Sequence, residues 1–476
     1  MEKRNDSIYV CISSERYTPF SLAKKIGAKA ILESASFNKG RERYSIIMAE
    51  EAFKIVQDEE GVAFLIDGRR LPFYSAQKQD ADILDALVYV AAQNECQVKE
   101  IPLPASGIGY LGYEFAQRCD SIHLENQFDE LRLPESCFVA GHVYIVFDHF
   151  TEKLHIFGLN YAERQIDLRK KIDGLVQKLN NMDFSYMEQT EESEPYKIIT
   201  NEEQSKKEYC EKVEKLKERI IAGDIIQAVP SRRVQIECGS SALEIYRRLR
   251  MLNPSPYLLY IDFGDFQIAG ASPESLVRVV GGRASIHPIA GTIRRGKNEA
   301  EDEKLKMQLL ADPKENAEHL MLVDLARNDL GRVCAPGSVR VSQFMETETF
   351  SHVIHLVSNV EGTVAEGVEP IQVLRSSFPA GTVSGAPKIS AMQIVSGLEK
   401  IKRRFYAGAV GYVRPNGDLD FCITLRCAMK QGKIWTLQAG GGIVYNSNPE
   451  REFEETNEKM GALLAAFKKA DWVAAD

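Results

Sequence analysis

Two segments of the chain each present a pair of glutamates spaced three residues apart. Glu315 and Glu318 follow Asp312-Pro313, and Glu452 and Glu455 lie within the last thirty residues. Residues three apart share one face of a helix, and proteins hold Mg2+ with one or two carboxylates plus bound waters. The two pairs together predict an Mg2+ site with two direct glutamate ligands and two that act through water. Either pair alone is also typical of a solvated helix face or a helix N-terminus.

A run of glycines stands before the second glutamate pair. The sequence AGGG occupies 439–442, and Lys459 lies one helical turn beyond Glu455. Glycines let a ligand approach backbone N–H groups closely, and the lysine adds a positive charge on the same helix stripe. This combination predicts that an anionic small molecule binds beside the metal. Without the first glutamate pair, the segment also fits a loop followed by an amphipathic helix.

The overall composition narrows the choice of partners. The 476 residues are 44% hydrophobic and 27% charged, and 59 basic against 68 acidic side chains give a formal charge of −9. A nucleic-acid partner requires a basic surface, so we expect none. The nine cysteines form no CxxC pair, the N-terminus lacks a signal-like apolar run, and no stretch is long enough to span a membrane. We therefore expect a cytoplasmic protein without a membrane partner.

Hydrophobic patterns predict the elements that position these groups. Helical periodicity covers 205–224, 299–331 in two pieces broken at Asp312-Pro313, and 450–470. Alternating segments that predict strands occupy 137–150, 153–160, 227–237, 257–263, 266–280, 403–413, 419–430 and 433–445. Short connections such as RPNGD at 414–418 favour hairpins. The expected fold class is α+β with antiparallel sheets.

One change in composition divides the chain. The segment 182–204 is acidic and polar, with Pro195 near its centre, which is typical of a linker. A chain of this length has room for about two to three domains. We expect an N-terminal domain over 1–185, a linker over 186–204 and a larger domain over 205–476 that contains both glutamate pairs.

Six motifs in the second half of the chain occur together in one known family. They are PIAGTIRRG (288–296), EHLMLVDLARNDLGR (318–332), HVIHLVSNVEG (352–362), FPAGTVSGAPKISAM (378–392), YAGAVGY (406–412) and AGGGIVYNSNPEREFEETNEK (439–459). In sequence and order they resemble the chorismate-utilising enzymes, most closely the large, synthase subunits (component I) of anthranilate synthases. The resemblance implies a layered antiparallel β-sandwich wrapped by helices, with an N-terminal regulatory domain and a C-terminal catalytic domain.

The resemblance also implies roles for individual residues. Chorismate carries two carboxylates, and the family pattern places Mg2+ on Glu318 and Glu455 directly and on Glu315 and Glu452 through water. The residues that it assigns to substrate binding are Gly291, Thr292, Tyr406, Arg426, Gly440, Gly441, Gly442 and Lys459. Those that it assigns to catalysis are His355, Glu274, Thr382 and Gln227. We expect His355 to assist departure of the enolpyruvyl group and Glu274 to handle or orient a proton.

Three of these residues also have ordinary structural explanations. Arg426 fits a cation on a strand surface, and Tyr406 fits a core aromatic. His355 lies among Val353, Ile354, Leu356 and Val357, where a histidine is commonly a hydrogen-bonded packing residue.

Two positions discriminate between reactions within the family. Relatives that add water to chorismate carry a lysine base where this chain has Gln227, and an amide is no base at neutral pH. Aminodeoxychorismate synthases typically read PIKGT with a nucleophilic lysine, whereas Ala290 stands in PIAGT here. Both positions favour attack of ammonia on the ring, loss of the 4-hydroxyl and release of pyruvate to give anthranilate. Aminodeoxychorismate synthase component I remains the nearest alternative.

Two further motifs predict feedback inhibition by tryptophan. ILESAS (31–36) resembles the LLES motif of anthranilate synthases, and NPSPYL (253–258) resembles its partner NPSPYM. The expected inhibitor site consists of Glu33, Ser34, Pro256, Tyr257 and Leu258. Leu258 replaces a common methionine, which is a conservative change of volume. ILES alone also fits an ordinary strand end.

The nitrogen source is expected to lie outside this chain. None of the nine cysteines stands in a G-x-C-x-G nucleophile elbow. The chain should therefore use free ammonia alone and glutamine only with a separate glutamine amidotransferase subunit, in an expected heterotetramer. An alternative of another class is a non-catalytic tryptophan-binding regulator, against which the complete set of site residues argues.

Overall fold

The computed structural model describes residues 6–36, 40–41, 43–75, 78, 80–125, 128–181, 183–188, 195–349 and 353–468. The α-helices are α1 (Pro19–Ile26), α2 (Ile83–Ala92), α3 (Ala116–Cys119), α4 (Leu168–Asn180), α5 (Ser185–Glu188), α6 (Glu202–Ala222), α7 (Ala242–Leu252), α8 (Glu299–Ala311), α9 (Pro313–Gly331), α10 (Ile371–Ser377), α11 (Lys388–Leu398) and α12 (Pro449–Phe467). Two short 3-10 helices are η1 (Tyr113–Phe115) and η2 (Gly381–Val383).

The strands come from both halves of the chain. Those of the first half are β1 (Ser7–Ser13), β2 (Ala30–Glu33), β3 (Ala35–Ser36), β4 (Gly40–Arg41), β5 (Tyr44–Asp58), β6 (Gly61–Ile66), β7 (Arg69–Pro72), β8 (Ile108–Leu111), β9 (Ser136–Asp148), β10 (Lys153–Leu159) and β11 (Lys197–Ile198). Those of the second half are β12 (Gln227–Ala228), β13 (Ser231–Glu237), β14 (Tyr257–Asp262), β15 (Gln267–Ser272), β16 (Ser275–Val280), β17 (Arg283–Ile286), β18 (Ile289–Arg294), β19 (Arg340–Thr349), β20 (Val353–Thr363), β21 (Gly385–Ala386), β22 (Ala409–Val413), β23 (Leu419–Ile423), β24 (Cys427–Gln431) and β25 (Ile434–Gly440).

Antiparallel pairing arranges the strands in two layers that share their longest members. In one layer the strands are hydrogen-bonded in the order β13, β25, β24, β15, β14, β2, β5, β9, β10 and β1. The other continues from β9 through β8, β22, β23, β16 and β17 to β20. The register of β5 on β9 shifts between Met48 and Phe53, and such bulges bend a strand pair. The pair β5–β9 therefore passes from one layer to the other, which confirms the expected antiparallel sandwich.

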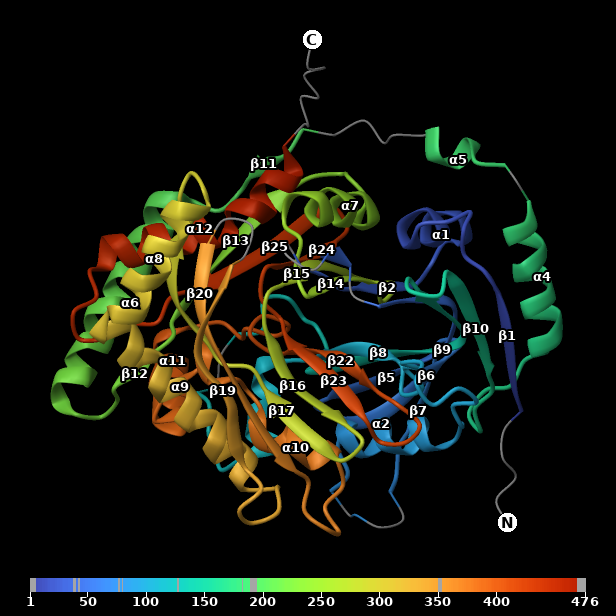
Figure 1. The fold of residues 1–476 in the computed structure, drawn as a ribbon, viewed down its shortest axis with the longest axis horizontal. Coiled ribbons are helices and arrows are strands. Elements are labelled where there is room, and N and C mark those ends of the chain that lie inside the picture. The colour runs from blue at the N-terminus through green and yellow to red at the C-terminus, as the bar shows by residue number, and fades with distance from the viewer. Residues whose placement is uncertain are drawn as a thin grey trace.

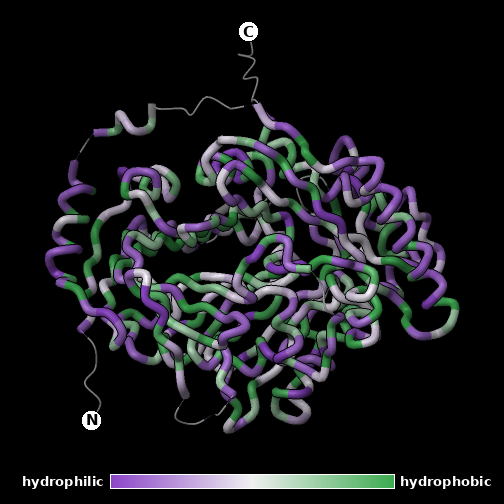
Figure 2. Tube along the Cα trace, turned by 180° about the vertical axis from the view of Figure 1, so that it is seen from behind, coloured by the Kyte–Doolittle hydropathy of each residue, from purple (hydrophilic) through white to green (hydrophobic). Residues whose placement is uncertain are grey.

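Two hydrophobic clusters hold these layers. The larger contains side chains from both layers, among them Phe53, Tyr110 and Phe421. The second lies under helices and includes Leu249 of α7 and Met460 of α12. Figure 1 shows α6, α8, α9, α11 and α12 gathered on one side of the strands, with α1 and α4 at the opposite end. Figure 2 shows hydrophilic residues frequent along these outer helices, as expected for helices that cover a core with one face.

Local signals position the helices that carry the predicted site. The side chain of Asp312 accepts hydrogen bonds from the backbone N–H groups of Lys314 and Glu315, and Pro313 occupies the first turn of α9. Asn448 caps α12 in the same way, again with proline in the first turn. Ser/Thr/Asp/Asn caps followed by proline are strong helix starts. The predicted break at Asp312-Pro313 and the predicted last helix are both confirmed.

The predicted strand over 403–413 begins later than expected. Strand β22 starts at Ala409, and Arg404 and Ala407 before it have positive φ angles of 56° and 60°. The buried guanidinium of Arg403 donates to the backbone oxygens of Val229 and Val383 and to Glu399. These contacts hold residues 403–408 in turns, and an extended strand could not make them.

The segment predicted to be a linker contains regular structure at both ends. Helix α5 overlaps its beginning and β11 pairs with β13 near its end, while 189–194 lie outside the described residues. Pairing crosses the expected division of the chain, since β2 lies on β14 and β8 on β22. The boundaries 1–185 and 205–476 stay a prediction. Among the described helices, none combines the length and hydropathy that a membrane span requires.

Candidate active site

A cavity of about 320 Å³ brings most of the predicted site residues together. Strands β18 and β20, the end of β25, helix α12 and several loops form its wall. The predicted residues that line it are Pro256, Glu274, Thr292, His355, Thr382, Tyr406, Arg426, Gly440, Gly442 and Lys459, together with Ala290. Gly291, Gly441 and Gln227 are not among its lining residues, and neither are the four glutamates predicted to bind the metal. A cavity of this volume suits a small organic molecule.

Arg426 supplies the positive end of the cavity. It lies in the turn between β23 and β24 with a positive φ of 51°, a conformation that costs free energy for a non-glycine residue and is enriched at functional sites. Within the described part of the chain its guanidinium has no salt-bridge partner. Burial lowers its pKa, opposed by nearby Tyr406, Glu455 and Glu274. A part-buried cation that makes no salt bridge among the described residues favours binding of an anion.

The glycine run leaves no room for side chains. A Cβ on Gly440 would lie 2.5 Å from the backbone oxygen of Pro230 and 3.2 Å from the Tyr406 hydroxyl. A Cβ on Gly442 would lie 2.6 Å from the Gln227 amide nitrogen, and one on Gly441 would lie 3.1 Å from a Glu452 oxygen. The glycines therefore allow the end of β25 to pack tightly beside the cavity.

A bulge in β18 orients His355. The pairing of β18 with β20 shifts register between Ala290 and Thr292, where Gly291 has a φ of 66°. The bulge places the Gly291 carbonyl 3.0 Å from His355 Nδ1, and the Thr292 hydroxyl lies at 3.0 Å as well. A carbonyl only accepts hydrogen bonds, so Nδ1 carries the proton and Nε2 is the basic nitrogen. Burial lowers the pKa of His355, which keeps the ring neutral.

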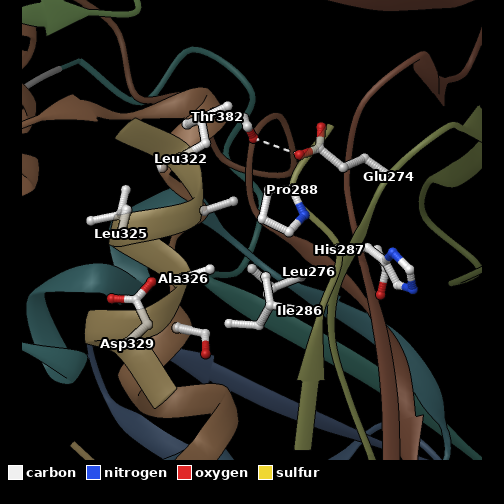
Figure 3. A pocket seen from close by; sticks show the side chains of 14 residues that line it. Glu274, Leu276, Ile286, His287, Pro288, Leu322, Leu325, Ala326, Asp329 and Thr382 are labelled. Carbon is white, nitrogen blue, oxygen red and sulfur yellow. Dashed lines mark hydrogen bonds between the residues drawn. The ribbon is translucent and has the colours of Figure 1, made fainter. Parts of the chain in front are cut away.

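Glu274 and Thr382 are hydrogen-bonded to each other at the edge of a second, smaller cavity. The Thr382 hydroxyl donates to Glu274 Oε1 at 2.9 Å, as Figure 3 shows. Both residues line the large cavity and also a space of about 30 Å³ bounded by Leu322, Leu325 and Asp329 of α9. Burial raises the pKa of Glu274 to about 7, which is opposed by the Thr382 hydrogen bond. This carboxyl can therefore exchange a proton near neutral pH.

The four predicted metal ligands lie on α9 and α12. Burial raises the pKa of Glu318, and neighbouring Glu315, Glu452 and Glu455 raise it further. Lys459 is 2.7 Å from Glu455 and donates to the backbone oxygen of Gly440 at 2.8 Å. No group of three or more His, Cys, Asp or Glu side chains in the described chain forms a preassembled metal cage.

These carboxylates fit an Mg2+ ion. Mg2+ uses one or two direct carboxylates and fills its remaining positions with water or substrate oxygens, so it needs no three-residue cage. Burial is the main cause of the raised pKa of Glu318 and of Glu452, and neighbouring glutamates raise both further. A divalent cation neutralises this kind of accumulated negative charge. The assignment of individual ligands stays a prediction.

The two motifs predicted to bind an inhibitor are neighbours in the sheet. Glu33 of β2 lies opposite Leu258 of β14, and the N–H of Ala35 donates to the oxygen of Ser255. Glu33 is buried, accepts from the Tyr246 hydroxyl at 2.6 Å and is 3.1 Å from Arg250.

Tyr257 differs from the other inhibitor-site residues. Successive residues of a strand point to opposite faces, and the Tyr257 hydroxyl donates to Asp420 of β23 at 2.9 Å, away from the Glu33 side. Pro256 lines the large cavity itself. The inhibitor motifs thus adjoin the candidate active site through the loop before β14.

Sequence reasoning missed some residues that line the cavity. Gln438 stands two residues before Gly440 on β25 and shares its face; its amide donates to the Ser231 hydroxyl at 2.8 Å. The period of two along a strand could have identified it. Asn253, the first residue of the NPSPYL motif, also lines the cavity. Nothing in the local sequence near Val229 indicates that it lines the cavity, because its place follows from the hydrogen bond to Arg403.

Comparison with known proteins decides the family. The profile of the family described as chorismate binding enzyme matches residues 36–465. The anthranilate synthase component 1 of Spirochaeta aurantia is 47% identical over 463 residues, covering 97% of this chain and 95% of that protein. That of Aquifex aeolicus is 37% identical, with 98% and 95% covered. The chain belongs to the anthranilate synthase component 1 family of chorismate-binding enzymes.

Solved structures agree with this family in fold. The anthranilate synthase component I of Streptococcus pneumoniae superposes with a TM-score of 0.78 at 36% identity, covering 89% of this chain and 92% of that one. The menaquinone-specific isochorismate synthase of Escherichia coli matches with a TM-score of 0.70 at 16% identity, covering 98% and 95%; this likeness concerns the fold alone. The expected chorismate-utilising fold is confirmed.

Proposed function

We propose that this chain catalyses the Mg2+-dependent conversion of chorismate and ammonia to anthranilate and pyruvate, the first committed step of tryptophan biosynthesis. The observation that carries the proposal is the distribution of charge in the cavity and beside it. Arg426, a part-buried cation that makes no salt bridge among the described residues, lines it. Outside its lining, Glu318 of α9 interacts electrostatically with Glu315, Glu452 and Glu455. A small dicarboxylate could join these two ends, bound to the cation by one carboxylate and to the metal by the other.

Glu318 and Glu455 would bind the Mg2+ ion directly, and Glu315 and Glu452 would bind it through water. A bound Mg2+ would supply charge neutralisation and orientation for the ring carboxylate. Lys459 now pairs with Glu455, and a divalent cation at Glu455 would free its ammonium for the substrate. Arg426, Tyr406 and the N–H groups of Gly440, Gly441 and Gly442 would bind the second carboxylate.

Two side chains are suited to the proton transfers. In the first stage ammonia adds to ring carbon 2 and the 4-hydroxyl leaves as water, which requires a proton. Glu274 carries a proton for a substantial fraction of the time near pH 7 and would donate it. In the second stage carbon 2 loses its proton as the enolpyruvyl group leaves to become pyruvate. The basic Nε2 of the neutral His355 would accept that proton, while the Gly291 carbonyl holds the ring.

Two neutral side chains favour ammonia over other nucleophiles. Gln227 packs against Gly442 and offers an amide where a lysine would activate water. Ala290 lines the cavity and offers no amine to attack the ring. Ammonia must therefore come from solution or from a partner, and we propose a glutamine amidotransferase subunit as its source.

We also propose that tryptophan inhibits the enzyme at Glu33, Ser34 and Leu258. Glu33 keeps one buried oxygen without a partner among the described residues, and such an atom gains a hydrogen bond from an ammonium group. The neighbouring loop, which contains Pro256, lines the active-site cavity. Binding at β2 and β14 can therefore change the cavity through a single loop.

A product assay tests the proposal. The purified chain is incubated with chorismate, ammonium and Mg2+, and the products are separated and identified. Formation of anthranilate and pyruvate in equal amounts supports it. Formation of aminodeoxychorismate assigns the chain to the folate-type reaction instead, and stabilisation by tryptophan without any chorismate turnover identifies a regulator that has lost its chemistry.

A further inference from the structure

Tyr209 of α6 has a buried hydroxyl that the described residues leave without a hydrogen-bond partner. Its side chain has no exposed surface and packs among Val213, Ala391, Ile443 and Phe453. The hydroxyl oxygen makes no hydrogen bond within the described chain. Leaving a buried hydroxyl unsatisfied costs free energy, so such a group calls for an explanation.

The hydroxyl is directed at the glycine run. Its oxygen lies 3.3 Å from the point that a Cβ on Gly441 would occupy, and an oxygen of Glu452 lies 3.1 Å from the same point. The absent side chain at Gly441 therefore leaves a gap that both groups border. Burial raises the pKa of the hydroxyl, Glu452 makes the largest of the charge contributions that raise it further, and the nearby backbone N–H of Gly441 opposes the rise. Tyr209 thus keeps its proton and faces a carboxylate as a hydrogen-bond donor.

We infer that Tyr209 is a positioning residue for Glu452, to whose carboxylate it donates a hydrogen bond when the metal site is filled. The inference rests on the proposed function, since it concerns the glutamate that reaches Mg2+ through water. Outer ligands of a metal need such partners to fix their orientation, and loss of one commonly weakens metal binding about 10- to 100-fold. Helix α6 would then contribute to a site built otherwise by α9, α12 and β25.

The test compares metal binding with stability. Tyr209→Phe removes only the hydroxyl, and Tyr44→Phe is the matched control. The Tyr44 hydroxyl is also buried and unpartnered among the described residues, but it does not border the gap at Gly441. Binding of Mn2+, as a spectroscopic substitute for Mg2+, is measured by electron paramagnetic resonance. Thermal unfolding is measured on the metal-free protein.

We expect Tyr209→Phe to weaken Mn2+ binding about tenfold, the effect of losing one hydrogen bond to a charged group, and Tyr44→Phe to leave it unchanged. The metal-free Tyr209→Phe protein should unfold at the same temperature as wild type or higher, because the lost hydroxyl had no partner. In a Glu452→Gln background, the effect of Tyr209→Phe on Mn2+ binding should fall below about twofold.

Three results overturn the inference while leaving the proposed function intact. They are unchanged Mn2+ affinity in Tyr209→Phe, a loss of affinity that is the same with and without Glu452→Gln, and a destabilised metal-free protein whose affinity is normal. If the wild-type protein binds no Mn2+, the proposed magnesium site is itself refuted, and the role of Tyr209 with it.

Discussion

At the scale of single residues, Glu274 links the electrostatics of the cavity to a measurable pH dependence. Its pKa of about 7 arises from burial and is restrained by the hydrogen bond from Thr382. If the protonated form donates to the departing hydroxyl, kcat/KM for chorismate at constant free ammonia should fall above about pH 7. Thr382→Val should move this inflection upward, because it removes the group that lowers the pKa most. An inflection that persists in Glu274→Gln would contradict the assignment.

The same carboxyl affects stability in a defined pH window. The unfolded chain releases this proton near 4.5, whereas the folded chain holds it to about 7. Raising the pH from 4.5 to about 7 therefore lowers the unfolding free energy of wild type. The unfolding free energy of Glu274→Gln lacks this contribution. The difference in unfolding free energy between the two proteins, measured by chemical denaturation, should grow across that window and be constant above it.

The metal ligands are tested by removing one negative charge at a time. Glu318→Gln and Glu455→Gln should each reduce Mg2+-dependent turnover by at least about a hundredfold, the upper end of what outer-shell changes cost. The fold should remain, since both side chains are part-exposed. Glu454→Gln is the control, because Glu454 is exposed on the same helix. A fully active Glu318→Gln enzyme would refute the ligand assignment.

At the scale of elements, the end of β25 tolerates no added methyl group. Gly440→Ala would place a Cβ 2.5 Å from a backbone oxygen, so the strand must shift, at a cost of about 1–3 kcal/mol. We expect a lower unfolding temperature and at least about a tenfold higher KM for chorismate. Gly461→Ala on α12 meets no atom within 4 Å and should instead stabilise the protein by about 0.5–1 kcal/mol.

The pairing of β2 with β14 makes inhibition separable from catalysis. Ser34→Phe places a large ring next to the Glu33–Leu258 pair and should raise the tryptophan concentration needed for half-inhibition by at least about tenfold, the effect of overpacking a site. Turnover without tryptophan should change little. Ser13→Phe, at an exposed position of β1, is the control. Equal inhibition of Ser34→Phe and wild type would contradict the proposed tryptophan site.

Elements with local causes were predictable, and those fixed by distant contacts were not. The start of α9 follows from Asp312 and Pro313, which act within one turn, and the sequence alone located it. The turns at 403–408 depend on Arg403 reaching Val229 and Val383, which no local pattern reveals. For the same reason the motifs identified many residues of the cavity, but they did not reveal that the loop before β14, which contains Pro256, forms part of its wall.

At the scale of the whole molecule, the chain has the cavity in which we propose that chorismate binds, but its sequence contains no glutaminase nucleophile motif. We expect ammonium to support turnover by the chain alone and glutamine to support it only after the amidotransferase subunit is added. The measurement is the rate of anthranilate formation with each nitrogen source, at matched pH. Glutamine-dependent turnover by the isolated chain would contradict the proposed division of labour.

The interleaving of early and late strands has a consequence for how the protein is made. Gly109 of β8 pairs with Gly411 of β22, and Ile31 of β2 pairs with Tyr260 of β14. On the ribosome, β8 can pair with β9 early, but its other edge must wait for nearly the whole chain to emerge before β22 exists. Unpaired strand edges are prone to aggregation, and sheets with distant partners form slowly. The nascent first half should thus depend on chaperones until synthesis reaches β22.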